Sequence, residues 1–493
     1  MEPLTRQVTE PDQLIELAST INNTGGRFIM AYLRYSENIP EVVYLVDQGS
    51  NLAFTELVLR NHTRLPSLSE VAPLLNWYER EIMDLSEIEF EGNPEPFPLV
   101  LLEGMSLSIG PFNPSQTQVP ELFGTPTQPK LPEVIEDQVQ DLFWGPVRGD
   151  ILESGEFHFA YIGEQILHYT PRLFYKHRGI ESGLTGSSLT KGLVLAERVS
   201  GVGSVSHAVA YCAAIENAFQ LEIPTRAQLI RIILSELERI YNNFHFFANL
   251  CKTTTLKVGE AFGALLEEEA KQINCKITGN RLLRNVLAVG GLRRDLAVEE
   301  LSTLLPPLRR KAEDYLEALS DTQSHLDRLI GTGILSQNLA FEFGATGPVA
   351  SASAIARDLR VNHPYSGYQN IQIDVTTRSS GDALARAEVR KSALFNAFTI
   401  IEQALSLIQP GPTKLDNIPV PPGTVDGLGW SEGPRGSCFY AIRIRDGLLE
   451  RVKIKSASFS NWKVFPLTVH STNMMDYAIN EASFGLTIAG ADR

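Results

Sequence analysis

The sequence predicts an α+β fold, in which a small α/β unit is followed by a mainly helical unit with β elements near both of its ends. The first hundred residues combine apolar positions at helical spacing with short β-prone runs. A proline-rich segment follows, and several long stretches with apolar residues at helical spacing occupy the remainder. The chain has 493 residues, 43% of them hydrophobic, which is enough for two or three domains with substantial cores.

Residues 1–105 are predicted to form the small α/β domain. Apolar side chains recur at helical spacing over residues 14–21, which indicates a helix. A second, amphipathic helix with a charged face is expected over residues 77–85. Apolar runs separated by Asn, Gly and Pro indicate three strands between these helices, at residues 28–33, 42–46 and 52–59.

Residues 106–138 are predicted to be a linker, because they are rich in Pro, Gln, Ser and Thr. Such a segment buries too little apolar surface to order itself as part of a core.

Residues 139–493 are predicted to form the main domain. Short strands are expected first, then long helices, then a strand-rich tail. Pro306 and Pro307 are expected to break or kink one of the helices, since proline lacks the N–H that a helix interior requires. The expected strands are 157–162, 165–169 and 439–459, and the expected helical segments are 205–219, 298–329, 382–408 and one that starts near Pro224.

Composition and cysteine spacing exclude several classes of function. Acidic residues exceed basic ones by 58 to 43, which gives a net charge of −15 and argues against a nucleic-acid partner. The four cysteines do not form a C-x-x-C pair, so their spacing predicts no zinc or iron–sulfur site and no disulfide framework. The chain also lacks a phosphate-binding loop and a nucleotide-binding fold, so NAD would bind to another subunit.

The sequence predicts a cytoplasmic protein. The first residues lack the basic and apolar regions of a signal peptide, and no run approaches the roughly 18 apolar residues of a membrane-spanning helix. If the protein works at a membrane, other subunits must hold it on the cytoplasmic face.

Two groups of motifs carry a resemblance to known families. Residues 77–85 and 88–94 resemble the W-x-E-R-E-x-x-D…G-I-x-F-x-G-x-P signature of the small, iron–sulfur-free (C-type) peripheral subunit of respiratory complex I. Residues 177–181 resemble the H-R-G-x-E motif shared by the quinone-site (D-type) subunits of complex I and group 4 nickel–iron hydrogenases. Further landmarks follow in family order at residues 224–228, 231–239, 278–281, 290–296, 347–348, 357–360, 363–365, 381–390 and 432–436.

The fusion of both types in one chain most resembles the large subunits of formate hydrogenlyase and hydrogenase-4-type complexes. Four cysteines of the hydrogenase motifs are missing, however. Residues 198–207 resemble R-x-C-G-x-C-x-x-x-H, and the last residues resemble D-P-C-x-x-C-T-x-R. The metal-ligand positions are occupied by Ser200, Gly203, Thr487 and Gly490. Because nickel requires soft thiolate ligands, the resemblance implies a subunit that cannot hold its metal.

The resemblance also implies roles for several charged residues. In hydrogenase relatives, the glutamate that matches Glu181 passes protons to or from the metal, and Arg178 belongs to the same motif. The histidine that matches His207 lies near an iron–sulfur cluster in the adjoining small subunit. The alternatives are that Glu181 and Arg178 belong to a structural lattice of ion pairs and that His207 is a hydrogen-bonded core imidazole.

Quinone reduction is the second chemistry of the family. In this chain, the two residues that bind quinone in relatives are replaced. Arg148 stands where relatives carry a quinone-binding histidine, and Leu189 stands where they carry a tyrosine. The expected lining of a ligand pocket is His177, Arg148, Arg198, Asp358 and Arg360.

The sequence is compatible with three functions. The first is an oxidoreductase subunit, related to NADH:quinone oxidoreductase, that forms a quinone or small-acceptor pocket beside a cluster-bearing partner. The second is a non-redox structural and coupling subunit on an ion-translocating membrane module, which the loss of the thiols and quinone ligands favours. The third, a free enzyme unrelated to membranes, is disfavoured by the number and order of the motifs.

Overall fold

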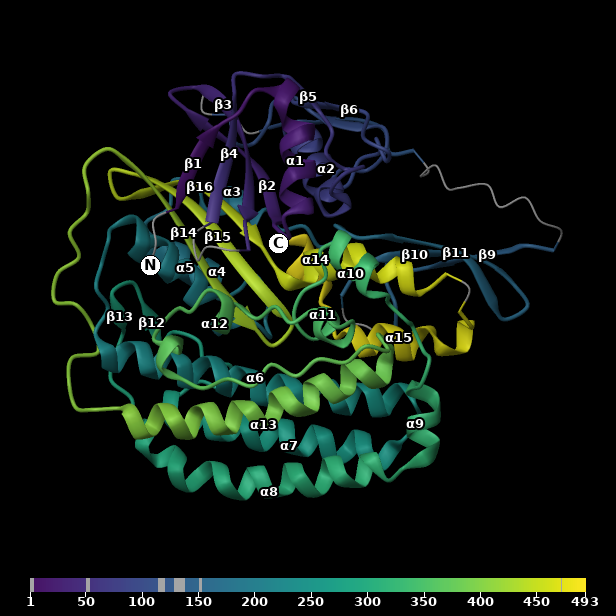
Figure 1. Cartoon of the computed structure of the whole chain (residues 1–493), viewed down its shortest axis with the longest axis vertical. Coiled ribbons are helices and arrows are strands. Elements are labelled where there is room, and N and C mark those ends of the chain that lie inside the picture. Colours follow the sequence, from purple (N-terminus) through teal and green to yellow (C-terminus); the bar gives the residue numbers. More distant parts are fainter. Residues whose placement is uncertain (1–3, 50–53, 114–119, 128–137, 150–152, 471) are drawn as a thin grey trace.

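The computed structural model describes residues 4–49, 54–113, 120–127, 138–149, 153–470 and 472–493 (Figure 1). A four-stranded sheet in the order β1-β4-β3-β2 organises the N-terminal unit. β1 runs parallel to β4, and the other neighbours are antiparallel. The elements of this unit are β1 (Thr5–Val8), α1 (Leu14–Asn23), β2 (Arg27–Ser36), β3 (Ile39–Asp47), β4 (Phe54–Arg60), β5 (Arg64–Pro66), α2 (Asn76–Leu85) and β6 (Glu89–Glu91).

The predicted elements of this unit are present, and the strand expected at 52–59 begins at Phe54 because residues 50–53 lie outside the described part. The described part of the predicted linker contains a short antiparallel pair, β7 (Met105–Leu107) with β8 (Leu122–Gly124). β8 is exposed along its length, so this pair adds little to the core.

The main unit begins with a three-stranded antiparallel arm, β9 (Gln140–Trp144), β10 (Glu156–Ile162) and β11 (Gln165–Arg172), which projects to the right in Figure 1. The helical part follows, with two short strands inside it. Its elements are α3 (Ile180–Leu184), α4 (Leu189–Ala196), α5 (Ser204–Ala218), α6 (Thr225–Thr253), α7 (Lys257–Thr278), β12 (Leu287–Ala288), β13 (Gly291–Leu292), α8 (Leu301–Ser320), α9 (Gln323–Leu329), α10 (Gln337–Glu342), α11 (Pro348–Ala352), α12 (Leu359–Asn362) and α13 (Ala383–Leu407).

An antiparallel sheet then follows, made of β14 (Thr424–Gly433), β15 (Gly436–Arg445) and β16 (Leu448–Lys455). Three short helices end the described chain: α14 (Ala457–Val464), α15 (Tyr477–Phe484) and α16 (Ile488–Asp492). Figure 1 shows this sheet between the N-terminal sheet above it and a layer of long helices, α6, α7, α8 and α13, below it. The α+β prediction is therefore correct, with β elements near both ends of the helical unit.

Pro306 and Pro307 are expected to break or kink their helix, and the break is not observed. Both prolines lie inside α8, which continues to Ser320. The carbonyls that lose their N–H partners belong to Ser302 and Thr303, which are exposed, so water can satisfy them. The helical segment is interrupted later, between α8 and α9.

Two glycines of β14 bring α5 into direct contact with the C-terminal sheet. A Cβ on Gly427 would lie 2.1 Å from the carbonyl oxygen of Ala214, and one on Gly429 would lie 2.2 Å from that of Ala210. Only a strand without side chains at these positions allows so close an approach. The small residues of α5 therefore fix the position of that helix, and of its N-terminus, on the sheet.

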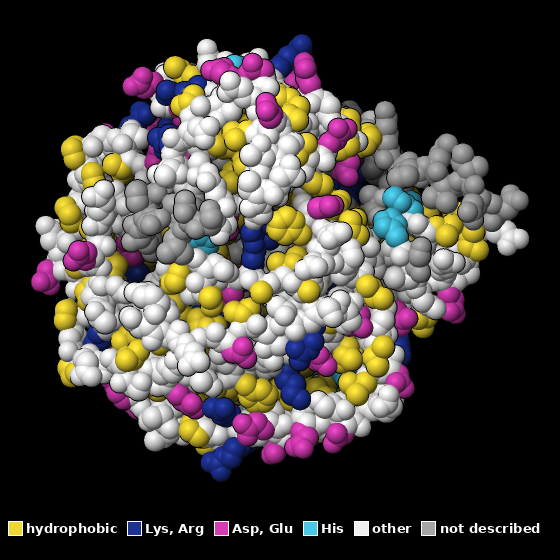
Figure 2. Space-filling view, viewed as in Figure 1, with side chains coloured by type: hydrophobic (Ala, Val, Ile, Leu, Met, Phe, Trp, Pro, Cys, Tyr) yellow, Lys and Arg dark blue, Asp and Glu magenta, His cyan; other side chains and the backbone are white. Residues whose placement is uncertain are grey.

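None of the helices in the described ranges combines the length and apolarity needed to cross a membrane. On the face shown in Figure 2, basic side chains lie among acidic ones along the helical layer and do not form a basic patch.

The charged motif of α2 is explained by buried carboxylates that organise loops. Glu79 accepts hydrogen bonds from the Ser67 and Ser69 hydroxyls and from the Leu68 N–H at 2.5–2.8 Å, and burial raises its pKa. Asp84 accepts the N–H groups of residues 99–101 at 2.7–3.2 Å. The helix thus holds the chain that follows it.

We expect Asp84→Ala to lower the free energy of unfolding by about 1–3 kcal/mol, because three backbone N–H groups lose their acceptor. Glu91→Ala, which removes an exposed carboxylate from β6, is the matched control and should change stability by about 0.5 kcal/mol or less. Urea unfolding of both variants measures the difference. Equal losses would show that Asp84 does not organise this loop.

Candidate functional site

The four positions that match metal ligands converge on one cavity. Ser200, Gly203, Thr487 and Gly490 line it together with His207. Its volume is about 40 Å³, which is space for roughly three water molecules. The other lining residues are Ser206, Gly433, Pro434, Arg435, Gly436, Cys438, Ser456, Ala457 and Ser458.

The N-terminus of α5 presents His207 to this cavity. Glu238 of α6 accepts the N–H groups of Val205 and Ser206 at 2.7 and 3.0 Å, and also the Ser206 hydroxyl. A carboxylate at this position satisfies helix-terminal N–H groups and interacts favourably with the helix dipole. Glu238 is fully buried, and burial raises its pKa.

Arg178 joins the two loops that carry the cavity. Its guanidinium donates to the carbonyls of Arg198 and Val199 at 3.0 and 2.7 Å, and to the carbonyl of Ala489 at 3.0 Å. The conformations of the 198–203 loop and of the C-terminal segment are therefore tied to each other through one side chain.

His207 is a neutral, hydrogen-bonded imidazole. Its Nδ1 lies 2.9 Å from the Tyr440 hydroxyl and 3.6 Å from the Cys438 sulfur. Burial lowers the pKa of His207 to about 3, and the charge of Arg178 acts in the same direction. Burial also raises the pKa of the Cys438 thiol, so the pair is an uncharged thiol beside an uncharged ring at neutral pH.

The C-terminal side of the cavity is a network of hydroxyl groups. The Ser458 and Thr487 hydroxyls lie 3.1 Å apart, and the Thr487 hydroxyl accepts the Gly490 N–H at 3.2 Å. A Cβ added to Gly490 would lie 2.6 Å from the Thr487 hydroxyl oxygen. Across the cavity, a Cβ on Gly203 would meet nothing closer than 3.4 Å. A larger residue at 490 would therefore require the Thr487 side chain to shift, whereas position 203 has room.

Glu181 lies outside the cavity, in a buried ion cluster. It accepts hydrogen bonds from Arg451 at 2.9 Å, Arg493 at 3.1 Å and the Ile454 N–H at 3.1 Å. Burial alone would raise its pKa, but Lys453, Arg451 and Arg493 together hold it well below its usual range. Glu181 is therefore ionised at neutral pH, an arrangement that supports the ion-pair alternative for this residue.

Glu81 connects this cluster to the N-terminal unit. It lies on α2, where it pairs with Lys453 at 2.6 Å and with Arg493 at 2.9 Å. Burial raises its pKa, yet Arg493 and Lys453 outweigh that effect and lower it. Two carboxylates from α2 and α3 thus share three cations from β16 and the end of the chain.

The residues expected to line a ligand pocket do not line this cavity. Arg148 lies over the rings of Trp144 and Phe157, at 4.2 and 4.6 Å, and pairs with Glu481. His177 lies 2.6 Å from the carbonyl of Asp492, through Nδ1. These contacts attach the arm and the 174–178 loop to the end of the chain.

The other three expected residues serve local structure. Arg198 is partly exposed and donates to the carbonyl of Val194 at 2.7 Å. Asp358 accepts the Arg360 N–H at the start of α12 and pairs with its guanidinium at 2.7 Å. Arg360 also pairs with the buried Glu236 at 2.9 Å, so this group joins α12 to α6.

Most residues that line the cavity lie within the sequence motifs, but four lie outside them: Cys438, Ser456, Ala457 and Ser458. The serine-rich run at 456–460 was the one available indication. Asn242 connects the cavity loops, since it accepts a hydrogen bond from Arg435 at 2.6 Å and donates one to the carbonyl of Val202 at 2.8 Å.

The fold and the converging loops define a large subunit of the complex I and nickel–iron hydrogenase class. The chain belongs to this family. Residues 7–119 match the respiratory-chain NADH dehydrogenase 30 Kd subunit, residues 263–425 match the 49 Kd subunit, and residues 178–280 match nickel-dependent hydrogenase.

Individual relatives match two thirds or more of the chain. The chain is 28% identical to formate hydrogenlyase subunit 5 of Escherichia coli over 425 residues, which is 84% of this chain and 74% of that protein. It is 30% identical to the D 2 subunit of NADH-quinone oxidoreductase from Solibacter usitatus over 342 residues, or 67% of this chain and 91% of that protein. A chain of an archaeal membrane-bound sulfane sulfur reductase shares the fold, with a TM-score of 0.68 and 23% identity over 73% of this chain and all of its own length.

We expect Glu81→Gln to lower the free energy of unfolding by about 3–5 kcal/mol, because it leaves Lys453 buried with less compensating charge. The double variant Glu81→Gln, Lys453→Met should recover part of this loss. Since the pKa of Glu81 is lowered from 4.5, the stability it contributes is present above about pH 4.5 and is lost as the pH falls through the folded-state value.

Denaturant unfolding of the double-mutant cycle at several pH values measures this coupling. Additive effects of the two substitutions, or a wild-type pH profile in Glu81→Gln, would contradict the assignment.

Proposed function

We propose that this chain is the large peripheral-arm subunit of a membrane-associated complex of the complex I and hydrogenase type, and that its former metal pocket works without nickel. The observation that carries the proposal is the convergence of the four ligand positions on a cavity whose side chains donate hydroxyl groups instead of thiolates. Serine and threonine hydroxyls are poor ligands for soft metals, and glycine offers no side chain.

Family membership supports the proposal that this chain is one subunit of a larger complex. The relatives' names place them in NADH-quinone oxidoreductase, formate hydrogenlyase and a membrane-bound respiratory complex. By analogy, the partners are a small cluster-bearing subunit and ion-translocating membrane subunits, with this chain held on the cytoplasmic face. An iron–sulfur cluster would belong to the small subunit, and NAD would react only at other subunits.

The cavity itself is suited to the polar end of a small acceptor or a quinone. Neutral His207 and the hydroxyls of Ser458 and Thr487 line the cavity and can hydrogen-bond an oxygen atom, and the Tyr440 hydroxyl holds His207 in place. A volume of about 40 Å³ accommodates only that end, so the rest of such a molecule would lie against the partner subunit.

A non-redox coupling subunit is the second candidate, and the Glu181 cluster favours it. A carboxylate held ionised by several cations is a poor proton relay but an effective tie between domains. The two candidates are distinguished by the cysteines of the small partner protein. If that protein lacks its cluster ligands, no electron arrives at the cavity and the coupling function holds.

For the metal, we expect protein produced with excess nickel to contain well under one nickel per chain, because no thiolate is available at the four positions. Inductively coupled plasma mass spectrometry on the full chain measures this. A hydrogenase large subunit produced and purified in parallel is the positive control. About one tightly held nickel per chain would refute the metal-free cavity.

For Glu181, we expect Glu181→Gln and Glu81→Gln to reduce the turnover of the assembled complex in parallel with their loss of stability, because both break the same ion cluster. Glu81 serves as the matched control, since it contacts the same cations from another helix. Selective loss of turnover by about 10-fold or more in Glu181→Gln alone, at equal stability, would instead give Glu181 a proton-transfer role.

A further inference from the structure

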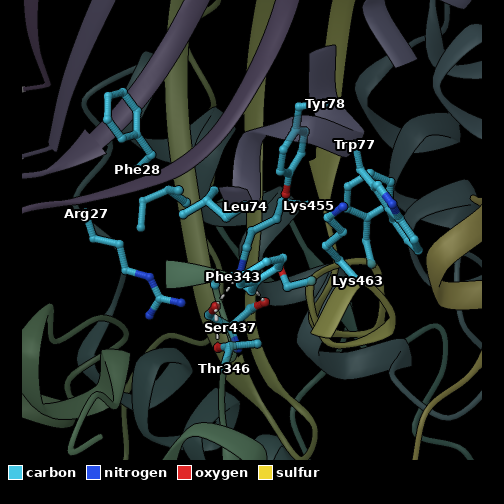
Figure 3. Close-up of a pocket in the computed structure, with 14 residues that line it drawn as sticks. Arg27, Phe28, Leu74, Trp77, Tyr78, Phe343, Thr346, Ser437, Lys455 and Lys463 are labelled. Carbon is cyan, nitrogen blue, oxygen red and sulfur yellow. Dashed lines mark hydrogen bonds between the residues drawn. The ribbon is translucent and has the colours of Figure 1, made fainter. Parts of the chain in front are cut away.

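A second cavity lies between the N-terminal unit and the C-terminal sheet, and cationic side chains dominate its polar lining (Figure 3). Arg27 enters it from β2, Lys455 from β16 and Lys463 from α14. The aromatic residues around them include Tyr78 and Phe343. The cavity volume is about 40 Å³. This site is separate from the His207 cavity, with which it shares no lining residue.

The register of β16 explains why a buried lysine reaches this place. Side chains two residues apart along a strand point to the same face, so Arg451, Lys453 and Lys455 form one row. Arg451 pairs with Glu181 at 2.9 Å, and Lys453 pairs with Glu81 at 2.6 Å. The third cation of the row, Lys455, has no carboxylate within 4 Å in the described ranges; it donates instead to the Ser437 hydroxyl at 2.6 Å.

Arg27 shares this lack of a close counter-charge. It is 7% exposed and donates to the carbonyl of Ala345 at 2.8 Å, but it makes no ion pair within 4 Å in the part of the chain that the structure describes. Lys463 has a weak pair, since the Glu95 oxygen 3.5 Å away belongs to a half-exposed side chain. Its ammonium also donates to the Asn76 side-chain oxygen at 3.1 Å.

Burying these positive charges costs free energy when no anion is bound in the cavity. Burial lowers the pKa of Lys455 to about 7, and the nearby Arg27 acts in the same direction. Burial likewise lowers the pKa of Lys463 to about 8 and that of Arg27 to about 9. The Tyr78 hydroxyl is also buried, and it makes no hydrogen bond of good geometry within the described residues, although Ser460 lies beside it. These are the groups that an anion would satisfy.

We propose that this cavity binds a small oxyanion, such as inorganic phosphate or sulfate, between Arg27, Lys455 and Lys463. Guanidinium and ammonium groups are the usual protein ligands of such anions, and each keeps N–H donors that its present contacts do not use. A volume of about 40 Å³ leaves room only for a small ion and is too small for a nucleotide or a lipid headgroup with its chains. Because its ligands come from both units, the bound ion would stabilise their association.

Calorimetric titration of the full chain with inorganic phosphate at constant ionic strength tests the proposal. We expect saturable binding and a melting temperature that rises with phosphate concentration. Lys455→Met should weaken phosphate affinity by about 10-fold or more, since a charged hydrogen bond is lost. Lys276→Met removes the same charge from the exposed surface of α7 and should leave affinity unchanged.

The phosphate-free melting temperature separates binding from a folding defect. Without phosphate, Lys455→Met should be at least as stable as the wild type, because it removes an uncompensated buried charge. Lys463→Met provides a second test at the other side of the cavity, with the same expected loss of affinity. Absence of saturable binding to the wild type, or equal affinity in wild type, Lys455→Met and Lys463→Met, would overturn the proposal.

Discussion

The buried ion cluster around Glu81, Glu181, Lys453 and Arg493 is the constraint on which the rest of the structure depends. It joins α2 of the N-terminal unit, α3, β16 and the last residue in one set of contacts at 2.6–3.4 Å. Removing one partner of such a set leaves a charge in the interior, which costs far more than the net contribution of the intact pair. The cluster therefore specifies how the two units meet. It also brings the C-terminal segment back to the 198–203 loop, where Arg178 completes the cavity.

That arrangement holds the loops around the cavity in place through contacts within the protein alone. In a metal site, the ion itself holds the ligand loops together. Here the same loops are held by backbone contacts of Arg178, by Glu238 at the start of α5 and by the Ser458–Thr487 hydroxyl pair. These interactions fix the backbone on both sides of the cavity, whatever the cavity contains. The cavity is thus a product of the surrounding lattice, and its contents are free to differ from those of the hydrogenase relatives.

Much of the fold followed from sequence pattern. Helical spacing identified α1, α5 and α13, and β-prone runs identified β2 and β3. The ordered motifs also placed Ser200 and Gly490 at one site although 290 residues separate them along the chain. Sequence pattern could not predict which charged residues pair with each other. A run such as residues 450–455 shows alternating cations, but no local rule states that their partners lie on α2 and α3. The same limit hid Cys438, which lies on β15 where that strand packs against α5, and Ser458, which lies on α14 where that helix packs against α16.

The row of cations on β16 shows that a buried cation does not always have a carboxylate partner. Three successive same-face positions carry Arg451, Lys453 and Lys455, and each is nearly excluded from water. The first two face carboxylates on helices that the strand crosses, whereas the third faces a cavity. A buried lysine without a carboxylate must either lose its proton or acquire a counter-ion. If Lys455 loses its proton, Arg27 remains as a charge in the same cavity, because its lowered pKa of about 9 still keeps it protonated at neutral pH. Neutralising Lys455 alone therefore does not remove the imbalance. A mobile anion compensates both groups at once, and for that reason the strand's third cation points to a ligand outside the chain.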